Sequence, residues 1–230
     1  MSRKQIIFGV IMAVIIVAAT VTTVALLLPE KAETFTVTFQ DFDGTVLKTE
    51  TVKAGKPASA PAEPKREGYT FFGWDKDFSA ITKDLVVKAE YIRNTETTFT
   101  VGTMTISPDT KRVEVKVSVT GNPGLLGMVF SVNYDEAALK LVDSQNGLAL
   151  SALTFQKPGN YKSGCNFVWY GSETGEVMDG EMLCLTFEIV DGTAPGTYPI
   201  SLSWNDRDIY DSNCDILKPG IVPGGIVITQ

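Results

Sequence analysis

The chain has 230 residues, of which 44% are hydrophobic and 10% aromatic, enough to build one large or two small domains around apolar cores. It contains no histidine, which removes the commonest general base, the Ser/His and Cys/His nucleophile pairs and the usual ligand of catalytic zinc. Its net charge of -7 argues against binding to nucleic acid phosphates. We therefore expect no enzyme, no cofactor and no nucleic acid partner.

An uncharged run from Ile6 to Leu28 follows Arg3 and Lys4. As a helix with a rise of about 1.5 Å per residue it would be roughly 35 Å long, enough to cross a hydrocarbon core of about 30 Å. The cations precede this run, so the positive-inside rule places the N-terminus in the cytoplasm and exports the rest. We expect residues 1–33 to form a cytoplasmic tip and an uncleaved transmembrane helix. The alternative is a cleaved signal peptide, whose cleavage site only residues 23–25 resemble.

After this run the chain reads as strands, and the first group lies within residues 34–93. Asp43-Gly44 is typical of a hairpin turn, and the proline-rich stretch from Pro57 to Pro64 predicts an extended crossover rather than a central strand. A unit this small needs its aromatic side chains in the core. The expected strands are Phe35–Phe39, Thr45–Val52, Tyr69–Trp74 and Leu85–Tyr91.

The motifs of this segment follow a recognisable order. The hairpin turn at Asp43-Gly44 comes first, then the run Gly68–Trp74, which reads GYTFFGW, and then Ala89-Glu90-Tyr91. This order resembles the Listeria-Bacteroides repeat of bacterial surface proteins. The resemblance implies a small β-grasp-like module that serves as a spacer or adhesive unit. Residues 94–98 are polar and are expected to form a linker.

Residues 99–230 also read as short strands joined by Pro/Gly turns, which is typical of a two-sheet sandwich of jelly-roll type. The clearest strand alternates valines with polar residues from Val113 to Val119, which predicts one buried and one solvated face. Asp135 to Val142 predicts a helical turn capped by Asp135. The other expected strands are Val101–Ile106, Gly127–Tyr134, Leu148–Phe155, Cys165–Tyr170, Met182–Val190, Thr197–Trp204 and Gly225–Thr229.

The same segment resembles the cohesin family in the order of its motifs. These are a glycine before a strand that ends in Tyr134-Asp135, an aromatic strand at Phe167–Tyr170, and later motifs within residues 179–187, 194–200 and 223–228. The resemblance implies a nine-stranded sandwich that binds dockerin-containing proteins, such as carbohydrate-active enzymes or scaffold subunits. It also implies a scaffold for polysaccharide degradation, as in a cellulosome or amylosome, at the surface of a bacterial cell membrane. Any calcium would belong to the dockerin.

In this family the dockerin-binding face lies on the sheet that contains the strands 127–134 and 165–170. The resemblance implies that Phe130, Val132 and Tyr134 point inward on the first strand, so that by alternation Val129, Ser131 and Asn133 face outward. On the second strand we expect exposed aromatic side chains that form an apolar patch, although a slip of one residue would bury Trp169. The expected partner-binding residues are Gly127, Val129, Ser131, Tyr161, Phe167, Trp169 and Ser172.

Two positions on this face depart from the family pattern. The best-known cohesins place an amide and a carboxylate where this chain has Gly127 and Val129, so the resemblance implies a more apolar dockerin contact. The alternatives are a carbohydrate-binding module, because jelly-roll sandwiches with exposed Trp and Tyr also bind polysaccharide, and a structural adhesin or spacer. An apolar centre with a polar rim favours the protein partner.

Other groups of residues are less specific. The stretch Asn205–Asp215 carries several carboxylates that suit calcium, but it lacks the glycine and the closing glutamate of an EF-hand and also fits a solvated loop. The pairs Glu173/Glu176 and Asp179/Glu181 offer carboxylates for glycoside hydrolysis without an aromatic cleft. The three cysteines show neither CxxC spacing nor a disulfide framework. We expect no metal site and no catalytic site.

Overall fold

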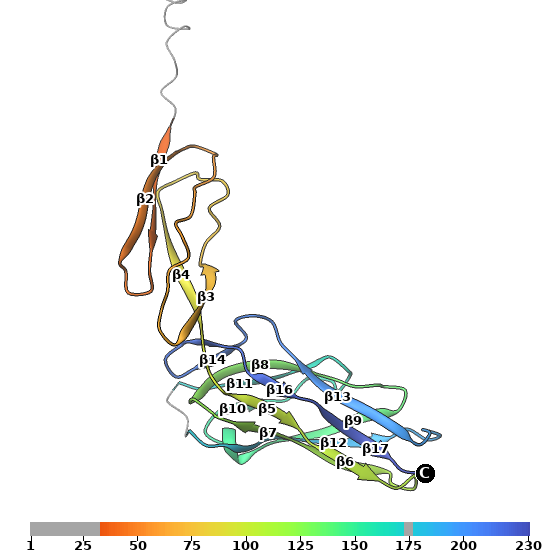
Figure 1. Cartoon of the computed structure of the whole chain (residues 1–230). Coiled ribbons are helices and arrows are strands. Elements are labelled where there is room, and N and C mark those ends of the chain that lie inside the picture. Colours follow the sequence, from red (N-terminus) through yellow and green to blue (C-terminus); the bar gives the residue numbers. More distant parts are fainter. Residues whose placement is uncertain (1–32, 173–176) are drawn as a thin grey trace, which may run out of the picture. The chain divides into compact units, whose positions relative to one another are not determined.

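A computed structural model of the chain describes residues 33–172 and 177–230 (Figure 1). The expected membrane span, Ile6–Leu28, lies outside the described residues, as do Glu173 and Glu176. No helix within the described ranges is long and apolar enough to cross a membrane. In this part of the chain the single helical element is the 3-10 turn η1 (Leu148–Leu150), so the expected all-β class is confirmed there.

The chain divides into two compact units. The described part of the first unit comprises residues 33–61 and 76–88, and the second unit comprises residues 62–75 and the described residues from 89 to 230. The strand β4 (Leu85–Arg93) contributes its first half to one unit and its second half to the other.

The first unit is built on the predicted hairpin. Strands β1 (Thr34–Gln40) and β2 (Val46–Lys53) pair antiparallel, and the first half of β4 lies parallel to β1. The turn between β1 and β2 has Gly44 at φ +87°, and Oδ1 of Asp43 accepts a hydrogen bond from the Thr45 N–H, as expected for Asp-Gly. Phe39 is fully buried and packs edge-on against Phe78.

The second unit begins with β3 (Tyr69–Trp74), which pairs antiparallel with the second half of β4. The ring of Phe71 packs edge-on against the rings of Trp74 and Tyr91, which agrees with the structural role expected for these aromatics. The short strand β15 (Ile216–Leu217) pairs parallel with the end of β4 within the same unit.

The remainder of the second unit is a sandwich of two sheets (Figure 1). One sheet has the strand order β16-β5-β7-β12-β9, and the other contains β10, β11, β8, β13 and β14, with β17 and β6 following β13. The bounds are β5 Thr98–Val101, β6 Thr103–Ile106, β7 Arg112–Thr120, β8 Leu125–Asn133, β9 Leu139–Asn146, β10 Thr154–Gln156, β11 Cys165–Tyr170, β12 Gly180–Ile189, β13 Gly196–Ser203, β14 Ile209–Asp211, β16 Gly220–Val222 and β17 Gly224–Ile228.

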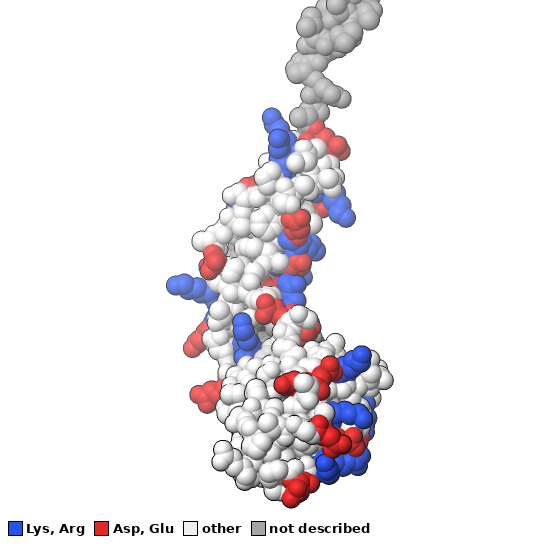
Figure 2. All heavy atoms as spheres, turned by 90° about the vertical axis from the view of Figure 1, so that its right-hand side faces the viewer, with Lys and Arg blue, Asp and Glu red and all other residues white. Residues whose placement is uncertain are grey.

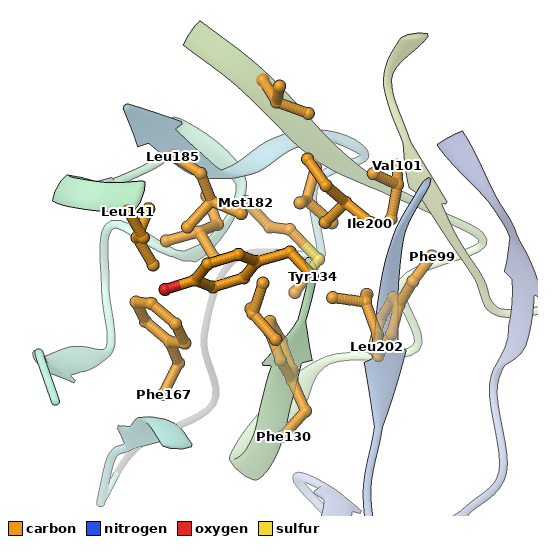
Figure 3. Packing of buried hydrophobic residues seen from close by; sticks show 14 of the residues in the cluster. Phe99, Val101, Phe130, Tyr134, Leu141, Phe167, Met182, Leu185, Ile200 and Leu202 are labelled. Atoms are coloured by element: carbon orange, nitrogen blue, oxygen red, sulfur yellow. The ribbon is translucent and has the colours of Figure 1, made fainter. Parts of the chain in front are cut away.

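Side chains from both sheets form one hydrophobic core (Figure 3). The alternation predicted for β7 is confirmed, since its four valines are buried and the residues between them face solvent or are half-buried. Large aromatic side chains fill the centre of the core, among them the fully buried Phe99, Phe130 and Phe187. Because this core is large and continuous, the sandwich needs no disulfide, and all three cysteines are free.

Two predicted elements differ from the structure. Asp135 does start a turn, since its Oδ1 accepts a hydrogen bond from the Ala137 N–H, but β9 begins at Leu139, so the helical turn expected to reach Val142 is wrong. Leu139 and Leu141 are buried and alternate with the exposed Lys140, which is the period of a strand. In the structure this segment pairs antiparallel with β12.

The expected strand Leu148–Phe155 is also wrong over most of its length. Gly147 lies against the backbone of Glu181, whose carbonyl oxygen would be 2.1 Å from a β-carbon at this position. The chain therefore leaves the sheet here, forms η1, and becomes a strand again only at β10.

Candidate partner-binding face

The prediction that Phe167 and Trp169 are exposed is wrong. Phe167 has 0% of its surface accessible and Trp169 1%, whereas Tyr170 is 52% exposed. Figure 3 shows Phe167 among the core side chains, with Phe130 and Tyr134. The indole N–H of Trp169 donates a hydrogen bond of 2.8 Å to Oδ1 of Asn146, which satisfies its polar group inside the sandwich.

Register explains this burial. Phe167 lies directly opposite Phe130 and Trp169 opposite Met128 in the antiparallel pair β11–β8. Residues that lie opposite each other share a face of the sheet, so the inward set on β8 fixes the inward set on β11. The sequence held this signal, because the set Cys165, Phe167 and Trp169 is wholly apolar and the set between its members includes Asn166.

The parity predicted for β8 is confirmed, because Phe130 and Val132 are buried while Val129 and Ser131 are half-buried on the other side. On the solvent side of this sheet, none of the side chains of β8, β10, β11, β13 and β14 carries a charge. We call this surface the neutral face. Its members are Gly127, Val129, Ser131, Asn133, Thr154, Gln156, Asn166, Val168, Tyr170, Ser201, Ser203 and Tyr210.

An apolar centre lies at one end of the neutral face. Gly127 is opposite Tyr170 on β11 and opposite Tyr210 on β14, so two tyrosines flank a residue without a side chain. In the next row Val129 lies opposite Val168. Tyr170 and Val168 thus occupy, on this face, the place expected for Trp169 and Phe167.

A polar hollow of about 270 Å³ lies beside this centre. Its lining includes Ser131, whose hydroxyl donates to Oδ1 of Asn166 at 2.6 Å, and Asp208, whose Oδ2 accepts from the backbone N–H of Asn205 at 2.8 Å. Ser203, which also lines the hollow, accepts a hydrogen bond from the side-chain amide of Asn133. The face therefore combines an apolar centre with hydroxyl and amide groups, and the carboxylate of Asp208, which lies outside the strands, borders the hollow.

The outward side of β7, β9 and β12 has the opposite character, and we call it the charged face. Arg112 pairs with Glu188 at 2.6 Å, and Lys140 contacts the same carboxylate at 3.5 Å. Lys116 pairs with Glu181 at 2.9 Å. Figure 2 shows acidic and basic side chains interleaved on one side of the sandwich, in the lower part of the view, next to a broad area without charge.

The two remaining expected residues, Ser172 and Tyr161, lie outside the strands of the neutral face. Ser172 is exposed just after β11. Tyr161 packs against the core, its hydroxyl lies 3.0 Å from Oγ of Ser144 on β9, and its carbonyl oxygen accepts a hydrogen bond from the hydroxyl of Tyr134. Burial raises the pKa of Tyr134 to about 12.

The acidic stretch 205–215 uses its carboxylates for contacts inside the second unit. Asp211 is fully buried and forms an ion pair with Arg93, and Asp215 accepts a hydrogen bond of 2.6 Å from the hydroxyl of Tyr69. Among the described residues, no group of three or more His, Cys, Asp or Glu side chains is placed to hold a metal ion.

The carboxylates of Asp179 and Glu181 have different partners. Asp179 accepts hydrogen bonds from the backbone N–H groups of Gly121 and Asn122, which lower its pKa, and Glu181 pairs with Lys116. Both side chains therefore have structural partners.

Comparison with known families decides the nature of the sandwich. The Listeria-Bacteroides repeat domain matches residues 35–101, and the cohesin domain matches residues 97–228, more than half of the chain. The chain belongs to the cohesin family. Cohesin domains are non-catalytic protein-interaction modules, which agrees with the expectation that the chain is not an enzyme. No curated protein matches the chain.

Solved cohesin structures resemble the sandwich. The sixth cohesin of scaffoldin B from Acetivibrio cellulolyticus, in complex with a dockerin, has a TM-score of 0.50 at 20% identity and covers 58% of this chain and 99% of its own. The third cohesin ScaC of the same organism, in complex with the ScaB dockerin, has a TM-score of 0.50 at 18% identity with the same coverage. A non-cellulosomal cohesin from the archaeon Archaeoglobus fulgidus has a TM-score of 0.49 at 18% identity, covering 59% of this chain and 92% of its own. At these identities the likeness concerns the fold.

Proposed function

We propose that this cohesin binds dockerin-bearing proteins and that the neutral face is the docking surface. The observation that carries the proposal is the absence of charge from the outward side chains of five strands, in a chain with 47 formally charged Lys, Arg, Asp and Glu residues, 20 basic and 27 acidic. An apolar centre with a polar rim is the usual anatomy of a protein interface. Membership of the cohesin family and the dockerin complexes of related cohesins support the same partner.

The wider setting is a second part of this proposal and rests on the sequence. The uncharged run Ile6–Leu28 anchors the chain in a bacterial cell membrane, with the N-terminus in the cytoplasm and the β units outside. The Listeria-Bacteroides repeat serves as a spacer between the membrane and the cohesin. The captured partners are carbohydrate-active enzymes or scaffold subunits of an assembly that degrades polysaccharide.

Titration of the full chain against a panel of dockerin modules tests the docking surface. The diagnostic variant is Val129→Lys, which places a cation beside the apolar centre of the neutral face. We expect it to weaken binding by about 100-fold or more, because the docked partner would desolvate the new charge at the apolar centre. The matched control is Ser118→Lys on the charged face, where Glu181 lies opposite and can accept the new charge.

The outcomes separate the proposal from its competitors. Equal loss of binding in both variants would contradict the assignment to the neutral face. Failure of every dockerin to bind, together with retention on insoluble or soluble polysaccharide, would instead identify a carbohydrate-binding module. The polar hollow beside Ser131 and Asp208 is the feature that favours this second function, because carboxylate, amide and hydroxyl groups bind sugar hydroxyls.

A further inference from the structure

We propose that Gly127 and the two tyrosines beside it form a specificity slot that accepts one aliphatic side chain of the dockerin. This inference rests on the proposed function and names the chemistry of the partner at the docking surface. It uses three strands, β11, β8 and β14, which place Tyr170, Gly127 and Tyr210 in one row.

The slot owes its space to the missing side chain of Gly127. Neighbouring strands are about 4.8 Å apart, so the backbones of the two tyrosines are roughly 10 Å from each other across Gly127. Cδ2 of Tyr210 lies 3.7 Å from the position that a β-carbon on Gly127 would occupy, and apart from Gly127 and its two chain neighbours no other heavy atom of the described residues lies within 4 Å of that position. Tyr170 on the other side is 52% exposed. A partner side chain can therefore enter above Gly127 between two rings.

The surroundings of the slot select an aliphatic group. Val129 and Val168 lie opposite each other in the adjoining row, so the neighbourhood of Gly127 is apolar on three sides. The carboxylate next to Tyr210 in the chain, Asp211, is fully buried and paired with Arg93. A lysine or arginine placed in the slot would lose hydration against the tyrosine rings and valines, whereas an aliphatic side chain would bury its surface against them.

Substitution of Gly127 tests the slot without disturbing the fold. Its backbone does not adopt a positive φ, and alanine in place of glycine within a strand is neutral or stabilising when no clash results. We expect Gly127→Ala to weaken dockerin binding by roughly tenfold and Gly127→Leu by about 100-fold or more, because the added atoms fill the space reserved for the partner. The matched control is Gly159→Leu, at an exposed glycine with nothing within 4 Å and no positive φ, which leaves the affinity unchanged.

Salt dependence supplies a second test on the same full chain. An interface of neutral groups predicts a Kd that changes less than about twofold between roughly 0.05 and 0.5 M NaCl, whereas docking by charge pairs weakens steeply over this range. In the dockerin that binds best, replacing the contacting aliphatic residue by alanine should remove the penalty of Gly127→Leu, and replacing it by lysine should abolish binding.

Each result has a distinct meaning. If Gly127→Leu binds like the unaltered chain while Val129→Lys does not bind, the slot is wrong and the neutral face still docks the dockerin. If both variants bind normally, the docking surface lies elsewhere and both proposals are overturned. Thermal unfolding of each variant shows that a loss of binding does not come from a loss of fold. Failure of every dockerin to bind the unaltered chain overturns the proposed function and, with it, the slot.

Discussion

The two outer faces of the sandwich cover the same core, but they differ in the charge of the side chains that they expose to water. The charged face interleaves acidic and basic side chains in pairs such as Arg112–Glu188 and Lys116–Glu181. The neutral face carries hydroxyl and amide groups around Gly127, Val129 and two tyrosines, without any charge among its outward side chains.

This difference in charge indicates that the charged face keeps the domain soluble and that the neutral face binds the partner. Mixed charges on a sheet face discourage association, because any partner must displace hydrated ions and match an alternating pattern. A face without charge has a lower desolvation cost on contact, so it suits a lasting protein interface. The core lies beneath both faces, which means that outward residues can change without loss of the fold. The predictions below use this separation, from the largest expected effect to the smallest.

Two neighbours on β11 provide the sharpest contrast between core and face. Trp169→Ala removes a buried indole that stacks on Phe155 at 4.8 Å, and we expect a loss of about 3–5 kcal/mol in the free energy of unfolding. Val168→Ala, on the outward side of the same strand, should cost less than about 1 kcal/mol and weaken dockerin binding. Urea denaturation with each full-length variant measures the first effect. A small cost for Trp169→Ala combined with loss of binding would reverse the two sides of the strand.

This strand also marks where prediction from sequence succeeded and where it failed. The all-β class and the hairpin at Asp43-Gly44 follow from alternation and turn chemistry that act over a few residues, and the parity of β8 follows from the resemblance to the cohesin family. The parity of β11 has a single local signal, the polar residue Asn166, and is fixed by its pairing with β8, while the irregular path from Gly147 to β10 runs against the backbone of Glu181, far away in the sequence. The sequence analysis also missed Tyr210 as a residue of the neutral face. Its strand, β14, is only three residues long, too short for alternation to be detected.

The ion pair between Arg93 and the buried Asp211 tests how much a charge away from both faces contributes to stability. Arg93→Met leaves the fully buried carboxylate of Asp211 with the backbone N–H groups of Asn213 and Asp215 as its remaining partners. We expect a loss of about 2–3 kcal/mol in the free energy of unfolding. The double variant Arg93→Met/Asp211→Asn should recover part of it, because no unpaired charge remains. An unchanged unfolding midpoint in urea for Arg93→Met would show that the ion pair does not contribute to the stability of the folded chain.

Tyr134 predicts how stability responds to alkaline pH. Burial raises its pKa from the ordinary 10.0 of a tyrosine to about 12, so between these pH values the folded chain holds a proton that the unfolded chain releases. Stability from this group is therefore present below pH 10 and declines as pH rises toward 12, by at most about 1.4 kcal/mol per pH unit. Tyr134→Phe should flatten this decline while losing the hydrogen bond to the carbonyl of Tyr161 at neutral pH. Parallel slopes for both chains between pH 10 and 12 would contradict the assignment.

The smallest effect should come from the charged face. Arg112 lowers the pKa of Glu188 through a hydrogen bond, so the stabilisation from this pair is present above the ordinary pKa of a glutamate and disappears as pH falls through the lowered value. Because the pair is exposed to water, Arg112→Gln should change the thermal midpoint of the chain barely more than a neutral surface substitution, and high salt should erase the difference. Its affinity for a dockerin should equal that of the unaltered chain, since Arg112 lies on the opposite face from Gly127. A loss of affinity as large as that of Val129→Lys would mean that the partner contacts both faces. This result would contradict the assignment of binding to the neutral face alone.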